Sequence, residues 1–171
     1  MSQPFPEDAF ADIMAANADF ALEFQDSLLT GRALRGLAIV TCMDSRITPL
    51  AAMGMSVGDC KILRNAGARV TQDVLRTLVL ATYLLGVDRV LVMPHTDCRM
   101  ASVDEAEIHA TIASEFGVDT RSLEFQTVRD QREALIVDVT RIRSFPLIPS
   151  SVVVAGAIYD VHSGRLEPVA C

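Results

Sequence analysis

Four short apolar runs, rich in branched side chains, recur at wide intervals along the chain. They cover residues 37–41, 61–63, 89–93 and 151–158. Polar or glycine-containing segments bound each run, and each is shorter than an ordinary helix, so each predicts a buried β-strand. A turn around Ser163 and Gly164 predicts one further, short edge strand near the C-terminus.

Apolar residues at helical spacing fill the segments between these strands. One run begins at Thr71, a candidate N-cap, and ends at Gly86; its apolar residues lie on more than one side, which predicts a helix covered on two faces. A second run predicts a helix over residues 122–143, which Pro146 prevents from continuing. Strands that alternate with helices predict an α/β fold, with a central, mostly parallel β-sheet of about four parallel strands plus an antiparallel edge strand, flanked by helices.

An N-terminal helical arm is predicted over residues 8–24. The apolar residues that fall roughly on one face of it are Phe10, Ile13, Met14, Phe20 and Phe24. This stripe either packs on the protein's own core, the commoner arrangement, or packs on a neighbouring subunit. Residues 1–6 hold two prolines among polar residues and predict a flexible tail. With no linker or repeat in the sequence, we expect a single domain over residues 1–171.

Composition places this fold in a broad class. Of the 171 residues, half are hydrophobic and 22% are charged, as in soluble globular proteins. The net charge of −7 and the lack of a basic run argue against binding to nucleic acid or to anionic membranes. The N-terminus has no basic segment followed by an apolar one, so we expect no secretory signal. These features predict a cytoplasmic protein whose cysteines stay reduced.

Metal-binding side chains follow two of the predicted strands. Cys42 ends the first strand, and His95 and Cys98 follow the third. Because functional groups gather at the carboxyl ends of parallel strands, the three residues converge if these strands are neighbours. Two thiolates and an imidazole suit Zn²⁺ and leave its fourth tetrahedral position open. Cys42 and Cys98 could instead be small buried hydrophobes, but the His-x-x-Cys spacing favours a zinc site.

Asp44 and Arg46 follow Cys42 on alternate residues. In extended chain this spacing places both on the same side as Cys42, where the guanidinium can hold the carboxylate in a bidentate pair and keep it ionised. The alternative is an ordinary surface ion pair, which contributes little to stability. Beside a metal, Asp44 could accept a hydrogen bond from bound water, or leave Arg46 and occupy the fourth position itself.

Three motifs occur in a fixed order along the chain: Cys42-x-Asp44-x-Arg46, Arg64-Asn65-Ala66-Gly67 and His95-x-x-Cys98. Together they resemble the β-carbonic anhydrase family. The resemblance implies that Cys42, His95 and Cys98 bind one zinc ion per subunit and that Asp44 with Arg46 forms the catalytic dyad. It implies a carbonate dehydratase, a zinc lyase in which zinc-bound hydroxide attacks carbon dioxide and gives bicarbonate and a proton. It also implies a homodimer, or a dimer of dimers, with active sites near the subunit boundary.

Other functions remain compatible with the same residues. The zinc site could hydrolyse carbonyl sulfide or carbon disulfide, or Asp44 could be a permanent fourth ligand in a non-catalytic zinc protein. A thiol redox enzyme built on Cys42 and Cys98 is less favoured, since the chain has no Cys-x-x-Cys motif.

Two positions near the motifs carry expectations about the backbone. Gly67 suits a positive φ or a close backbone approach, as part of a pocket wall. Arg99 is a departure, because the family usually has glycine directly after the second cysteine ligand. If that position needs a positive φ, arginine is strained there by about 1–2 kcal/mol. Its side chain could also alter access to the pocket.

Overall fold

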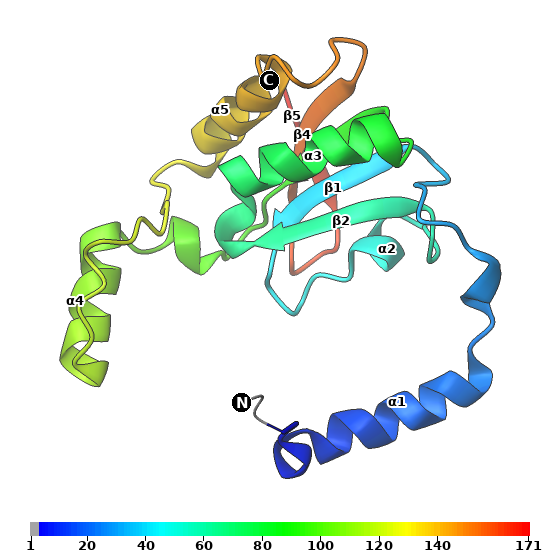
Figure 1. Ribbon diagram of the computed structural model, residues 1–171. Coiled ribbons are helices and arrows are strands. Elements are labelled where there is room, and N and C mark those ends of the chain that lie inside the picture. The colour runs from blue at the N-terminus through cyan, green and yellow to red at the C-terminus, as the bar shows by residue number, and fades with distance from the viewer. Residues whose placement is uncertain (1–3) are drawn as a thin grey trace. The chain divides into compact units, whose positions relative to one another are not determined.

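A five-stranded β-sheet forms the centre of the unit that spans Gly31–Cys171 (Figure 1). Its strands are β1 (Leu37–Cys42), β2 (Cys60–Asn65), β3 (Arg89–Met93), β4 (Val153–Tyr159) and β5 (Leu166–Val169). They lie in the order β2-β1-β3-β4-β5, and only the β4–β5 pair is antiparallel. The computed structural model describes residues 4–171 and confirms the predicted mostly parallel sheet with an antiparallel edge strand.

Helices α3 (Gln72–Leu84) and α5 (Gln131–Arg143) supply the apolar side chains that pack with one face of this sheet. All six residues of β1 are buried, as expected of a strand covered on both faces. The shared core includes Ala38, Val40, Leu78, Val90 and Val139. This packing explains why β1 and β3 read in the sequence as continuous apolar runs and not as alternating ones.

The opposite face of the sheet carries a second apolar cluster. Its buried members include Leu37, Ile39, Ile47 and Met93, and the short helix α2 (Pro49–Ala52) adds Ala52 at its margin. Cys42 and Cys98 belong to this cluster. Two of the three candidate metal ligands are thus packed among buried apolar side chains.

The predicted helix over residues 122–143 is wrong in its first part. Helix α5 begins at Gln131, because Asp130 caps it by accepting hydrogen bonds from the backbone N–H groups of Arg132 and Glu133. The segment before it is irregular, with Gln126 in the left-handed region at a φ of 61°. Its apolar side chains have helical spacing by coincidence. Helix α4 (Glu105–Phe116) precedes this segment and contains His109.

Helix α3 has the predicted limits, but Leu80 and Leu84 are exposed, so the predicted covering of a second face is not present within residues 4–171. The Thr71 side chain accepts a hydrogen bond from the Val74 backbone N–H, and the helix ends two residues before Gly86. Gly86 has a φ of 76°, which glycine adopts without a steric penalty. A capping side chain at one end and glycine after the other fix these limits.

The second unit runs up to Thr30 and is helical. It holds a short 3₁₀ turn (Glu7–Phe10), helix α1 (Ala11–Glu23) and a further turn (Asp26–Leu28), close to the predicted arm. None of the residues of α1 is buried. Of the predicted tail, residues 1–3 lie outside the described residues. Among residues 4–171, no helix has both the length and the apolar character needed to cross a membrane.

Candidate metal centre

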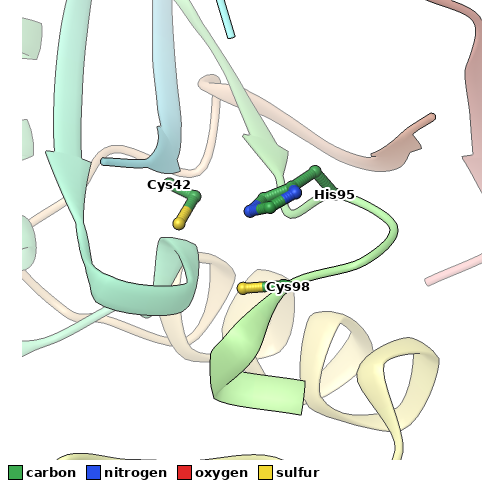
Figure 2. A group of neighbouring side chains, drawn as sticks. All are labelled: Cys42, His95 and Cys98. Atoms are coloured by element: carbon green, nitrogen blue, oxygen red, sulfur yellow. The ribbon is translucent and has the colours of Figure 1, made fainter. Parts of the chain in front are cut away.

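Three buried side chains converge where β1 and β3 end (Figure 2). The two strands are parallel neighbours, with Thr41 paired to Met93, so Cys42 comes to lie beside the segment that carries His95 and Cys98. The two sulfur atoms and a ring nitrogen of His95 lie within 4.8 Å of one another, and Figure 2 shows these side chains facing a common point. The structure thus brings together the three residues that the sequence singles out.

The His95 ring is oriented to present a lone pair to this point. Its Nδ1 lies 2.8 Å from the Thr96 backbone carbonyl oxygen, which can only accept, so Nδ1 carries the proton. Nε2 is then the unprotonated nitrogen. It is also the one buried side-chain nitrogen or oxygen without a hydrogen-bond partner within residues 4–171. A buried, unpaired acceptor is costly, and a metal ion would satisfy it.

The two thiols shift each other's pKa in opposite directions. A hydrogen bond from Cys98 lowers the pKa of Cys42. The pKa of Cys98 is raised, first by the bond to Cys42 and then by burial. A divalent cation would let both thiols ionise, and two thiolates with a neutral imidazole fit Zn²⁺.

Asp44 and Arg46 form the expected bidentate pair at the edge of this centre. Arg46 donates from Nε to Oδ1 (3.0 Å), from Nη2 to Oδ2 (2.7 Å) and from its backbone N–H to Oδ1 (2.9 Å). The Arg46 guanidinium holds the pKa of the Asp44 carboxyl well below its usual range. Oδ2 lies 3.8 Å from His95 Nε2. An ionised hydrogen-bond acceptor therefore lies next to the unpaired imidazole nitrogen.

The same fork occurs at a second Asp-x-Arg sequence. Arg121 donates to Asp119 from Nε, Nη2 and its backbone N–H, over 2.9, 2.7 and 3.0 Å. The Asp119 side chain is 62% exposed, whereas that of Asp44 is 19% exposed. The fork therefore also forms away from this centre, although the spacing alone does not produce it: the Arg132 guanidinium of Asp130-x-Arg132 donates to Glu167 instead. What sets Asp44 apart is its position beside His95, one of the three buried candidate metal ligands.

Arg64 holds the loop that follows β1. Its guanidinium donates to the backbone carbonyl oxygens of Cys42 (2.9 Å), Asp44 and Ile47 (3.2 Å). In the sequence Arg64 stands out only as part of the Arg64-Asn65-Ala66-Gly67 motif, and its spacing from Cys42 gives no sign of these contacts. Since β2 is the parallel neighbour of β1, Arg64 reaches across the carboxyl ends of the two strands.

Gly67 has both the positive φ and the close backbone approach expected of it. Its φ is 78°, and a Cβ placed there would lie 3.1 Å from Met100 Cβ. The strain considered for Arg99 does not arise. Arg99 is exposed, begins a short 3₁₀ turn (Arg99–Ala101) and has no positive φ. The residue in the left-handed region is Asp97, at a φ of 55°.

Comparisons with known proteins agree on one family. A model of the family described as "Carbonic anhydrase" matches residues 37–166. "Beta-carbonic anhydrase 1" of Mycobacterium tuberculosis is 33% identical over 161 residues, which cover 92% of this chain and 96% of that protein. The crystal structure of carbonic anhydrase from Streptococcus mutans has a TM-score of 0.88 at 35% identity and covers 99% of this chain and 100% of that one. "Carbon disulfide hydrolase" of Acidithiobacillus thiooxidans is 28% identical over 154 residues, 78% of this chain and 77% of that protein.

Proposed function

The chain belongs to the β-carbonic anhydrase family, and on that premise we propose that Cys42, His95 and Cys98 hold its catalytic zinc ion. The reaction is the reversible hydration of carbon dioxide to bicarbonate and a proton. The observation that supports this site best is the buried, unpaired Nε2 of His95, a residue that has a ring nitrogen within 4.8 Å of both sulfur atoms. The cofactor is one zinc ion per chain, with Asp44 and Arg46 as the catalytic dyad beside it.

The chain's own residues prepare and orient the reactants. When bound, zinc supplies a Lewis acid that makes hydroxide available near neutral pH. Asp44 accepts a hydrogen bond from the attacking water and so directs an oxygen lone pair at the carbon of carbon dioxide. Arg46 keeps Asp44 ionised and in place through its bidentate fork. The new carbon–oxygen bond gives bicarbonate, and the proton passes to solvent.

The surroundings of the site hold these groups still before the reaction begins. The Thr96 carbonyl fixes the tautomer of His95, and the Gln131 side chain donates to the His95 carbonyl oxygen over 2.8 Å. Arg64 restrains the loop that bears Asp44. Such preorganisation lowers the barrier because little rearrangement is needed as charge develops.

Stopped-flow measurement of carbon dioxide hydration by the zinc-loaded chain tests this function. We expect zinc-dependent turnover from about pH 6.5 to about pH 9, rising with pH as hydroxide becomes available. Full zinc occupancy without turnover across that range would contradict the proposal. Zinc bound by four protein ligands at every pH would identify a non-catalytic zinc protein.

A related substrate class is tested in the same experiment. Relatives named carbon disulfide hydrolase are similar to this chain, at 28% identity against 33% for the β-carbonic anhydrase of M. tuberculosis. Carbon disulfide and carbonyl sulfide present an electrophilic carbon to the same nucleophile. Release of hydrogen sulfide from either compound, together with weak carbon dioxide turnover, would assign the chain to that class.

We further propose that residues 1–171 act as one domain that assembles as a homodimer or a dimer of dimers. In support, α3 leaves Leu80, Tyr83 and Leu84 exposed, and Ile62 is exposed on the edge strand β2. The apolar stripe of α1 adds further surface that a second copy would cover. Light scattering after gel filtration should give at least twice 18.5 kDa, and a single 18.5 kDa species at micromolar concentration would contradict the assembly.

The cysteine chemistry bears on where the protein works. Zinc binding by Cys42 and Cys98 requires both as thiolates, and the structure has four free cysteines. We therefore propose a reducing compartment, the cytoplasm, as the location.

A further inference from the structure

Arg46 contacts both of the loops that bring metal-binding residues together. Besides its fork to Asp44, it donates from Nη1 to Asp97 Oδ2 (2.7 Å) and from Nη2 to the Asp97 backbone carbonyl oxygen (3.1 Å). Asp97 lies between His95 and Cys98 in the sequence. Arg121 makes the same fork to Asp119, but its ion pairs within residues 4–171 include no second carboxylate. The contact with Asp97 therefore distinguishes the fork at the metal centre.

The turn from His95 to Cys98 needs restraint, since it must aim two side chains at one point. Thr96 is held to β4 by the Tyr159 carbonyl oxygen (2.9 Å) and, just beyond that strand, by Asp160 Oδ1 (3.2 Å). Asp97 comes next and turns the chain with its φ of 55°, which aspartate adopts more readily than most residues. On this side of the turn, Arg46 supplies the hydrogen bonds to Asp97.

We propose that Asp97 is a positioning residue that locks the His95–Cys98 turn, through Arg46, to the loop that carries Cys42 and Asp44. This inference rests on the proposed function only in requiring that the centre binds zinc. Asp97 acts through Arg46. The Arg46 and Asp97 side chains are 43% and 63% exposed, so their ion pair contributes little to global stability. Its effect falls on the relative placement of the metal ligands, and hence on how firmly zinc is held.

The test compares zinc release from Asp97→Gly and from the unchanged chain, followed with a chromophoric chelator. Glycine accepts the positive φ, so this substitution removes the side chain without adding backbone strain. We expect zinc to leave about tenfold faster or more, with the unfolding midpoint of the metal-free protein unchanged. The visible spectrum of the cobalt-substituted protein should also change, because the ligand geometry loosens. Asp97→Asn keeps the turn and an uncharged acceptor for the hydrogen bond from Arg46. Its zinc release should therefore increase by less than that of Asp97→Gly.

Two further variants show whether the effect passes through Arg46. In an Arg46→Gln background, Asp97→Gly should add no further increase in zinc release. Asp119→Asn, which breaks the matching exposed fork, should release zinc as the unchanged chain does. Release at the unchanged rate from both Asp97→Gly and Asp97→Asn would overturn the proposal. So would an equal effect of Asp97→Gly with and without Arg46. Zinc release is measured without turnover. If Asp97→Gly speeds zinc release only when Arg46 is present, and the chain does not hydrate carbon dioxide, the result would refute only the proposed function.

Discussion

Cys98→Ser should leave a folded chain that neither retains zinc nor hydrates carbon dioxide. A hydroxyl is far less acidic than a thiol and is a poor ligand for zinc, so the site would keep only Cys42 and His95. Loss of the metal removes the means of making hydroxide near neutral pH. We expect kcat/KM to fall by about a thousandfold or more, which corresponds to about 4 kcal/mol of transition-state stabilisation.

Metal analysis after gel filtration and stopped-flow hydration measure the two effects separately. Cys171→Ser is the matched control, because Cys171 is an exposed cysteine outside the centre. Zinc at a thousandfold excess over its dissociation constant stabilises a protein by about 4 kcal/mol. The unfolding temperature of the unchanged chain should therefore rise by about 10 °C with zinc, whereas that of Cys98→Ser should not. Stoichiometric zinc and near-normal turnover in Cys98→Ser would contradict the assignment of Cys98.

Regular elements with strong local signals could be predicted from the sequence. Strand β3 has the predicted limits, because its apolar run ends at Pro94 on one side and follows the turn at Gly86 on the other. Helix α3 was predictable from Thr71 and Gly86, which act locally. Residues 122–130 were not, since the capping of α5 by Asp130 and the left-handed backbone of Gln126 outweigh the helical spacing of apolar side chains.

The candidate site also has some features that could be predicted from the sequence and others that could not. Cys42, His95 and Cys98 were predictable as a group, because strand ends of parallel neighbours meet and the residue types suit one ion. The contacts of Arg64 and Asp97 were not, because they join segments 20 and 51 positions apart through side-chain reach alone. The only sequence signal for Asp97 is its place between two candidate metal ligands, His95 and Cys98.

A comparison of the two Asp-x-Arg forks shows how the surroundings of Asp44 differ from those of Asp119. Asp44 and Asp119 have nearly the same hydrogen bonds to arginine, and in both the arginine lowers the pKa of the carboxyl. Only Asp44 lies beside a buried imidazole nitrogen, at 3.8 Å. The same substitution made in each fork in turn therefore tests the proposed catalytic role of Asp44 separately from the structure of the fork.

Asp44→Asn should keep zinc and lose most of the activity. Asparagine has nearly the same shape as aspartate, but its amide nitrogen donates where the attacking water needs an acceptor, and it cannot hold the charge that Arg46 stabilises. We expect kcat/KM to fall by about a hundredfold to a thousandfold, while metal analysis still finds one zinc ion per chain.

Asp119→Asn is the control for this substitution, since it makes the same chemical change in the same fork at an exposed position. It should leave both zinc content and kcat/KM unchanged. Unchanged kcat/KM in Asp44→Asn would show that Asp44 and Arg46 are an ordinary surface ion pair. Loss of zinc together with activity would instead identify Asp44 as a metal ligand, because a residue that only orients water is not needed to retain the ion.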